Sequence, residues 1–186
     1  LRDKSKITGK QIYAYGGDYG RFAMSDENFN NNGLVSPDRV PNPHAYEVQY
    51  VLQNIWSNLA DKKSGKVSVF NENFFVPLNN VTLDYAIEAE GKVLSNGSMN
   101  LDKYNIMPQT SKTIAIPNYG KVVGDKKNKG KELVLNLRYR LSSDTSLLKK
   151  GDEIAHQQFV VSKYNFPTLA TSGASKVKTV DHAKYV

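Results

Sequence analysis

Cysteine is absent from this sequence of 186 residues. Its absence excludes disulfides, thiolate zinc sites and a thiol nucleophile, and it leaves the redox compartment open. No apolar run is long enough to cross a membrane, and no charged start leads into an apolar stretch as in a signal peptide. Because the chain begins at Leu1 rather than Met, we expect an excised or processed piece of a longer protein, whose compartment stays undetermined.

Acidic residues are fewer than basic ones, and the formal net charge is +7. Such an excess can indicate nucleic acid binding, but here much of it lies in short lysine stretches beside Gly and Asn. The sequence shows no groove-fitting element and no stacking platform for bases. We therefore interpret these lysines as solvated loops and expect neither a nucleic acid nor a membrane partner. They are Lys126, Lys127, Lys129, Lys131, Lys149, Lys150, Lys176 and Lys178.

Residue constellations that usually mark catalysis are also missing. His44, His156 and His182 are far apart and share no metal-ligand spacing. Gly16-Gly17 leads into Asp18 rather than into the Gly-Lys-Ser/Thr of a phosphate loop. Neither a metal centre nor a nucleotide site is predicted from these residues.

The first zone, residues 1–53, is rich in Gly, Asn and Pro, which favours long ordered loops. Residues 11–15 predict a short strand. Asn42 can cap a helix and Pro43 suits its first position, so a helix is expected from there to about Gln53. Its apolar face comprises Ala45, Val48, Val51 and Leu52.

The second zone, residues 54–164, alternates between apolar and polar residues, as half-buried strands do. The alternation is clearest over residues 81–89 and 133–141. Tight turns are predicted at Glu90-Gly91 and at Asn96-Gly97. Six or seven short strands separated by turns predict an antiparallel sandwich. Other strands are expected around residues 67–69, 114–116 and 154–161. The third zone, residues 165–186, is rich in Ser, Thr, Ala and Lys and is typical of a linker or tail.

A longer motif runs through the first zone. It combines Tyr-Gly-Gly-Asp-Tyr-Gly at residues 15–20, Asn-Phe-Asn-Asn-Asn-Gly-Leu-Val at 28–35 and Pro-Asp-Arg at 37–39, followed by Pro41 and Pro43. Taken together, this string resembles the glycoside hydrolase family that includes the large bacterial β-galactosidases. The second zone resembles the domain that follows in that family.

The resemblance implies a definite division of the chain. Residues 1–53 are the C-terminal remnant of a catalytic TIM barrel, and residues 54–164 form an immunoglobulin-like domain. Residues 165–186 lead towards the next domain of the parent enzyme. The fold expected is therefore all-β, an immunoglobulin-like antiparallel sandwich preceded by an irregular segment and one short helix.

The resemblance also implies the function. Retaining glycosidases use two carboxyl groups about 5–5.5 Å apart, and in this family both precede Leu1. We expect a non-catalytic structural domain, inactive alone, of a parent that hydrolyses terminal β-D-galactosides with retention. Asp84 and Glu88, four apart on one strand, are about 13 Å apart by strand rise and cannot replace that pair. The expected partners are the other domains of the parent enzyme, and galactoside is expected to bind only in that parent. The resemblance is compatible with a homo-oligomeric parent and with either a cytoplasmic or a periplasmic location.

Three residues carry the site that the resemblance implies. Phe29 and Asp18 line the substrate site of the parent, and Phe29 binds sodium through its backbone carbonyl. Asn32 supplies a side-chain oxygen to the same ion. The alternative interpretations are a plain Asn-Gly turn and a hydrogen-bonded turn aspartate. We expect no cofactor in this chain alone, whereas the resemblance is compatible with both sodium and magnesium in the parent enzyme.

The residues, considered without the resemblance, are also compatible with a different class of function. Trp56 and the 11 tyrosines suit stacking on sugars, so an independent carbohydrate-binding or adhesion sandwich is the alternative hypothesis. Trp56 follows the predicted helix directly, however, and we predict that it packs between that helix and the sheet.

Overall fold

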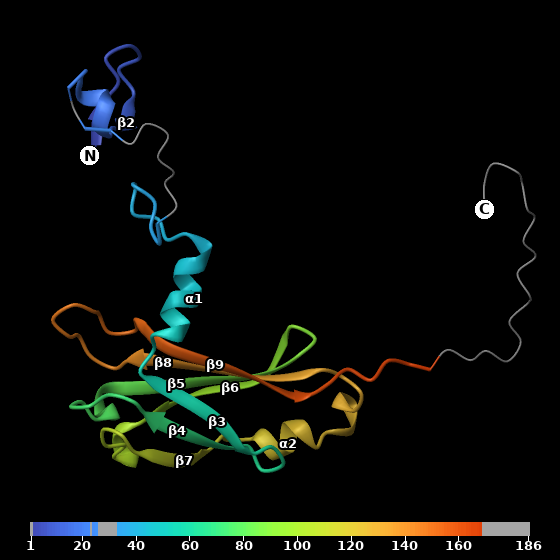
Figure 1. Ribbon diagram of the computed structural model, residues 1–186. Helices are drawn as coiled ribbons and strands as arrows, with labels where there is room; N and C mark the ends of the chain where they lie inside the picture. The colour runs from blue at the N-terminus through green and yellow to red at the C-terminus, as the bar shows by residue number, and fades with distance from the viewer. Residues whose placement is uncertain (1, 23, 26–32, 169–186) are drawn as a thin grey trace, which may run out of the picture.

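The computed structural model describes residues 2–22, 24–25 and 33–168. Helix α1, at Pro43–Val51, precedes a long run of strands (Figure 1). The strands are β1 (Arg2–Lys4), β2 (Gln11–Tyr13), β3 (Ile55–Asp61), β4 (Lys66–Asn71), β5 (Val81–Ala89), β6 (Lys92–Asn100), β7 (Ser111–Ala115), β8 (Leu133–Leu141) and β9 (Glu153–Ser162). The short helices are η1 (Gly16–Tyr19), η2 (Leu78–Asn80), η3 (Asp102–Tyr104), α2 (Tyr119–Val123) and η4 (Lys126–Asn128).

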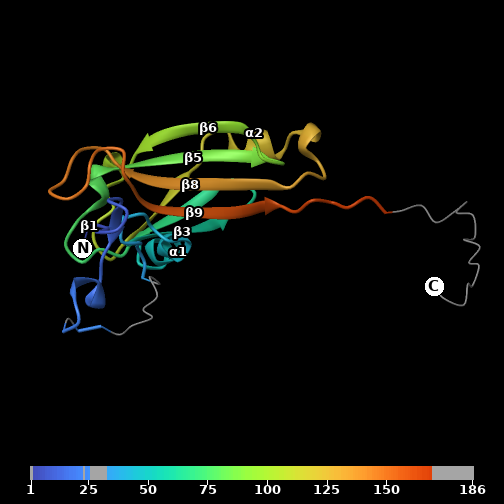
Figure 2. The same cartoon turned by 90° about the horizontal axis from the view of Figure 1, so that it is seen from above.

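Strands β3 to β9 form two antiparallel sheets that lie one above the other (Figure 1). One has the order β3-β4-β7 and the other the order β6-β5-β8-β9, whose four strands lie side by side in Figure 2. Two sheets packed face to face bury their inner side chains and leave the alternate ones outside. The predicted all-β fold, an immunoglobulin-like antiparallel sandwich behind an irregular segment and one helix, is confirmed.

The two central strands of the larger sheet build most of one side of the core. In β5 and β8 every second residue is buried, as the alternation predicted. Their register pairs Leu83 with Tyr139 and Tyr85 with Leu137, so apolar side chains of both strands share the inner face. The smaller sheet faces them with buried Ile55, Val67, Val69 and Ile114.

One polar contact joins the two sheets through the core. The hydroxyl of Tyr139 on β8 lies 2.5 Å from Oγ of Ser57 on β3. Burial raises the pKa of the Tyr139 phenol far above its ordinary value, although the hydrogen bond to Ser57 acts in the opposite sense. A buried hydroxyl needs a partner, and Ser57 supplies it from the opposite sheet.

The prediction of a tight turn at Asn96-Gly97 is wrong. Both residues lie inside β6, where Gly97 pairs with Tyr85 on β5. A Cβ at position 97 would lie 2.6 Å from the hydroxyl oxygen of Tyr85 and 2.8 Å from its Cζ. Glycine stands here because the tyrosine ring occupies the side-chain space. The turn predicted at Glu90-Gly91 is confirmed, and both residues have the positive φ that favours a two-residue hairpin, 50° and 76°.

Helix α1 begins at Pro43, as predicted, but ends at Val51 rather than near Gln53. Asn42 does not cap the helix with its side chain; instead its Nδ2 donates to the carbonyl of Gly33 at 2.6 Å. None of the α1 residues is buried, so the predicted apolar face is not enclosed by the described part of the chain.

The strand predicted at residues 11–15 is the shorter β2, which pairs with β1 in a separate two-stranded sheet. The lysine-rich stretch, interpreted as a loop, contains η4 and follows α2, and Lys126, Lys127 and Lys129 are exposed. Across the described residues, no helix is long and apolar enough to span a lipid bilayer.

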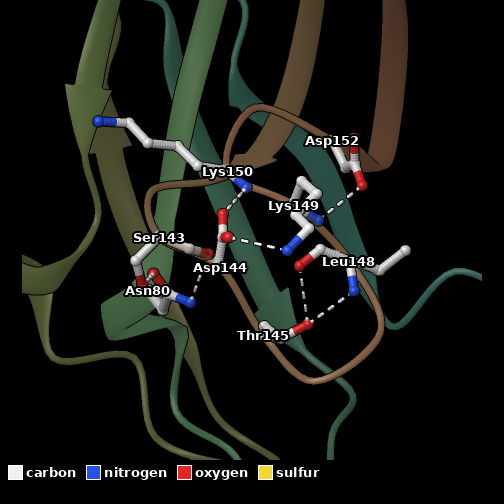
Figure 3. A network of polar contacts seen from close by, with 8 residues as sticks. All are labelled: Asn80, Ser143, Asp144, Thr145, Leu148, Lys149, Lys150 and Asp152. Atoms are coloured by element: carbon white, nitrogen blue, oxygen red, sulfur yellow. Dashed lines mark hydrogen bonds and ion pairs between the residues drawn. The ribbon is translucent and has the colours of Figure 1, made fainter.

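The connection between β8 and β9, residues 142–152, is a loop held by polar contacts (Figure 3). Asp144 accepts the backbone N–H of Lys150 at 2.8 Å and the Nζ of Lys149 at 3.1 Å. Asn80, which precedes β5, donates from Nδ2 to the carbonyl of residue 143 at 3.4 Å. The loop is therefore closed on itself and tied to the neighbouring connection.

Candidate functional site

Asp18, predicted to line a substrate site, lies on η1 with an exposed side chain. Its Oδ2 accepts the backbone N–H of Tyr15 at 2.9 Å, which stabilises the turn that follows β2. Gly16, in the same turn, has φ of +47°, and a Cβ there would lie 2.7 Å from the carbonyl of Met24. Asp18 is thus a hydrogen-bonded turn residue in this structure. Its role towards substrate stays a prediction.

Phe29 and Asn32, the predicted sodium ligands, lie outside the described residues. The residue directly after them is firmly held. The carbonyl of Gly33 accepts from Nδ2 of Asn42 at 2.6 Å and lies 3.1 Å from Nε2 of His44. The chain is therefore anchored to the start of α1 immediately after the predicted ion site. Within the described residues, no three His, Asp or Glu side chains gather as a metal centre requires.

A side-chain cluster joins the C-terminal end of α1 to the sandwich, and we call it the α1 joint. The Tyr50 ring lies edge-on to Trp56, with centroids 5.8 Å apart, and 5.2 Å from the ring of His156. Its hydroxyl donates to Oε1 of Gln157 at 3.2 Å. Buried Gln53 accepts the backbone N–H of His156 at 2.9 Å. The prediction that Trp56 packs between helix and sheet is confirmed.

The outer face of the larger sheet is hollowed above Ala86, in a depression of about 480 Å³ that we call the Ala86 hollow. Ala86 lies in the middle of β5, and its small side chain leaves room between the polar residues of the neighbouring strands. The polar residues that line the hollow are Asp84, Glu88, Asn96, Ser98, Asn136, Arg138 and Arg140. The two acids balance the two arginines, so an uncharged ligand rich in hydroxyl or amide groups fits the charge pattern.

Contacts within the Ala86 hollow leave part of its polar surface free. Nε of Arg140 lies 3.2 Å from Oδ2 of Asp84 in an ion pair, and Ser98 donates to the same carboxylate. Nε of Arg140 is itself buried and forms no hydrogen bond, so its contact with Asp84 is an ion pair only. Glu88 has no hydrogen-bond or ion-pair partner among the described residues. The hollow therefore has the chemistry of a polar binding surface.

The same carboxylates do not form a glycosidase pair. Asp84 and Glu88 lie on one face of β5 with Ala86 between them. Strand geometry separates residues four apart by about 13 Å, whereas a retaining mechanism needs carboxyl groups about 5–5.5 Å apart. The hollow can bind a polar group but lacks the spacing for this hydrolysis.

Trp56 was the only member of the α1 joint that the sequence singled out, and no motif pointed to the Ala86 hollow. Alternation placed Asp84 and Arg140 on the outer faces of their strands, but the strands are distant in sequence. Only the pairing of β5 with β8 brings the two side chains together. The one sequence signal for the hollow is Ala86, a small residue at a position of β5 whose neighbours on that face are polar.

Two protein-family models match the chain. The model described as β-galactosidase, domain 4 matches residues 67–162, just over half of the chain. The model described as the TIM barrel domain of glycosyl hydrolases family 2 matches residues 1–57. The α1 joint therefore connects the segments that the two models match.

Curated proteins similar to this chain include β-galactosidases from three bacteria. The one from Clostridium acetobutylicum is 36% identical over 155 residues, which cover 82% of this chain and 16% of the relative. The one from Priestia megaterium is 32% identical over 176 residues, covering 93% and 16%, respectively. For Leuconostoc mesenteroides the identity is 30% over 156 residues, covering 82% and 14%. The chain thus spans about one-sixth of the length of these relatives, and the resemblance inferred from its motifs is confirmed.

Proposed function

Because this chain belongs to the β-galactosidase domain 4 family, within glycoside hydrolase family 2, we propose that it is a non-catalytic structural part of a β-galactosidase. In this proposal the complete enzyme hydrolyses terminal β-D-galactosides with retention of configuration. Its two catalytic carboxyl groups lie on barrel strands outside this chain. The observation that carries the proposal is that one short chain matches both the barrel domain and domain 4.

The α1 joint supports a bracing role. Tyr50 contacts strand residues from both sheets, Trp56 on β3 and His156 on β9. Helix α1, which lies near the end of the barrel match, is therefore fixed to the sandwich by aromatic packing and hydrogen bonds. A joint of this kind holds two domains in one orientation, which a catalytic site built between domains requires.

The proposal divides the chain as the motifs predicted. Residues 1–53 belong to the barrel, residues 54–164 form the sandwich, and residues 165–186 lead to a further domain. The partners are the other domains of the same enzyme, and the proposal is compatible with a homo-oligomeric enzyme. Support for the first boundary comes from α1, which ends just before it, and from β3, which begins just after it.

We further propose that Phe29 and Asp18 line the substrate site of the complete enzyme. Phe29 and Asn32 offer a carbonyl and an amide oxygen, which are donors suited to a hard cation such as sodium. The anchored carbonyl of Gly33 supports this assignment, because it fixes the chain directly after Asn32.

The Ala86 hollow favours a second candidate function, an independent carbohydrate-binding module. Glu88 and Asn96 are free to bind sugar hydroxyls there. An exposed aromatic face, on which a sugar ring stacks, is not among the residues that line it, since Tyr85 is buried in the core. The hollow therefore supports this function less well than the family match supports the first.

Hydrolysis of a nitrophenyl β-galactoside tests the leading proposal. We expect no hydrolysis above the buffer rate by this chain alone, and full activity in the complete polypeptide, which extends this chain upstream through the barrel and downstream into the further domain. Activity of the chain alone, or a complete polypeptide without galactosidase activity, would contradict the proposal.

Calorimetry with galactose and lactose tests the alternative on the same sample. Saturable heat that disappears in Glu88→Gln and persists in Glu90→Gln, a change in the exposed hairpin turn, would favour the binding module. We expect no saturable heat from the unmodified chain.

A further inference from the structure

Large apolar side chains are exposed on the connection between β4 and η2, residues 72–77, which we call the FFV loop. Phe75 is 92% exposed, Phe74 is 72% exposed and Val76 is 58% exposed. Single exposed apolar residues are ordinary, but three in succession with two aromatic rings form a contiguous patch. Aromatic residues presented in this way are typical of the centre of a protein interface.

The FFV loop is held by Asn71, a fully buried residue at the end of β4. Its Nδ2 donates to the carbonyls of Val76 at 2.9 Å and Ile106 at 3.2 Å. Its Oδ1 accepts the backbone N–H of Asn73 at 3.1 Å and the Nδ2 of Asn73 at 2.9 Å. The loop thus presents its aromatic rings from a fixed base, which lowers the entropy lost when a partner binds.

The FFV loop lies beside the passage from α1 into the sandwich. The backbone N–H of Glu72 donates to the carbonyl of Asn54 at 2.9 Å, and Oε2 of Glu72 accepts from Nε1 of Trp56 at 2.6 Å. A depression of about 340 Å³ is lined by Asn54, Phe74, Phe75 and Gln109, among others. Figure 1 shows α1 meeting the sandwich at the end where β4 leads into this loop.

We propose that the FFV loop docks on the family 2 barrel domain and buries Phe74 and Phe75 between barrel and sandwich. The inference rests on the proposed function. The barrel is the favoured occupant because the loop is hydrogen-bonded to Asn54, the residue that directly follows the barrel part of the chain at residues 1–53, and the barrel match itself extends to residue 57. A second copy of the chain is disfavoured by the net charge of +7, which opposes self-association. The partner surface is apolar at its centre and polar around it, facing Asn73 and Gln109.

Thiol labelling tests the proposal, because this chain contains no cysteine of its own. Phe75→Cys is prepared both in this chain and in the complete polypeptide, and modification at position 75 is followed by peptide mass spectrometry. We expect labelling at least about tenfold slower in the complete polypeptide. The matched control is Val93→Cys on β6, an apolar position 55% exposed near the opposite end of β5. Its labelling rate should be equal in both.

Two outcomes would overturn the proposal. Equal rates at position 75 in both polypeptides would overturn the proposal. Slow labelling of this chain alone that disappears on dilution would assign the surface to a second copy and overturn it too. Phe74→Cys, at a second exposed position, repeats the measurement if the complete polypeptide does not fold with Phe75→Cys.

Galactosidase activity of the unmodified complete polypeptide separates this inference from the proposed function. An inactive polypeptide with slow labelling at position 75 would retain the docking surface and reject the function. An active polypeptide with equal labelling rates at position 75 would retain the function and reject the docking surface.

Discussion

Gly97 allows the ring of Tyr85 to lie across β6 inside the core. Replacing it with alanine would place Cβ 2.6 Å from the hydroxyl oxygen of Tyr85 and 2.8 and 2.9 Å from two of its ring carbons. The ring is buried and has few alternative rotamers, so we expect Gly97→Ala to lower the free energy of unfolding by about 1–3 kcal/mol. Urea denaturation measures the change. The control, Asn96→Ala at the exposed neighbouring position, should stay within about 0.5 kcal/mol of the parent chain.

Recovery of stability in a double variant would identify the cause. Tyr85→Leu removes the ring that clashes, so Gly97→Ala should lower the free energy of unfolding less in that background than in the unmodified chain. Equal cost in both backgrounds would show that the ring is not responsible.

The same glycine shows what single residues reveal before a structure is known. An Asn-Gly pair is a strong hairpin signal, and the sequence around it favoured a turn. The real reason for the glycine is its partner on β5, and strand register is not encoded near Gly97. By contrast, Glu90-Gly91 was correctly predicted, because a turn depends on local backbone conformation alone.

At the scale of elements, the loop at residues 142–152 should be sensitive to acid. The backbone N–H of Lys150, and then the side chain of Lys149, hold the pKa of Asp144 below its ordinary value of 3.8. The stabilisation by a carboxyl group of lowered pKa is complete above that ordinary value and is lost as the pH falls through the folded pKa. We therefore expect the Lys150 amide to lose its protection from exchange below about pH 4, before the β8 amides do.

Asp144→Asn is the matched variant for this loop, because the amide keeps an acceptor oxygen but does not titrate in this range. Its Lys150 amide should show no such change with pH, as followed by NMR between about pH 5 and pH 2. A change of equal size in both proteins would contradict the assignment to Asp144.

Elements were predictable where the pattern was local. Residues 81–89 and 133–141 became β5 and β8 with the bounds that their alternation indicated. Helix α1 begins at Pro43 as predicted, but it ends at Val51, before the predicted end at Gln53. Gln53 instead accepts the backbone N–H of His156. The contact of Tyr50 with His156 in the α1 joint and that of Asp84 with Arg140 in the Ala86 hollow each span more than 50 positions, which periodicity does not encode.

At the scale of the whole molecule, the motifs placed the chain in its family while the site residues stayed predictions. Phe29 and Asn32 were inferred from a family string, and the physics of the described residues supports only their surroundings, at Gly33 and Asn42. The antiparallel sandwich followed from strand patterns, whereas its immunoglobulin-like character was implied by the family resemblance. The active site does not follow from these patterns, because the proposed function assigns its carboxyl groups to barrel strands that precede this chain.

The sandwich as a whole should lose stability in alkali. Burial raises the pKa of Tyr139 far above the ordinary value of 10.0, and burial also raises the pKa of Tyr119. A group whose folded pKa is raised contributes stability that is fully present below its unfolded pKa and lost as the pH rises through the folded pKa. The free energy of unfolding should therefore fall above pH 10, by up to about 1.4 kcal/mol per pH unit for the buried phenol of Tyr139, with a smaller contribution from Tyr119.

Urea denaturation between about pH 8 and pH 11 measures this slope. Tyr139→Phe loses the hydrogen bond to Ser57, which lowers stability at pH 8 by about 1 kcal/mol, but it should decline less steeply above pH 10. Tyr46→Phe, at an exposed position of α1, should keep the slope of the unmodified chain. An equal slope in Tyr139→Phe would mean that the phenol between the two sheets does not govern the alkaline limit. If the slope is reduced as expected, the contact that joins the two sheets also sets the upper pH at which they stay together.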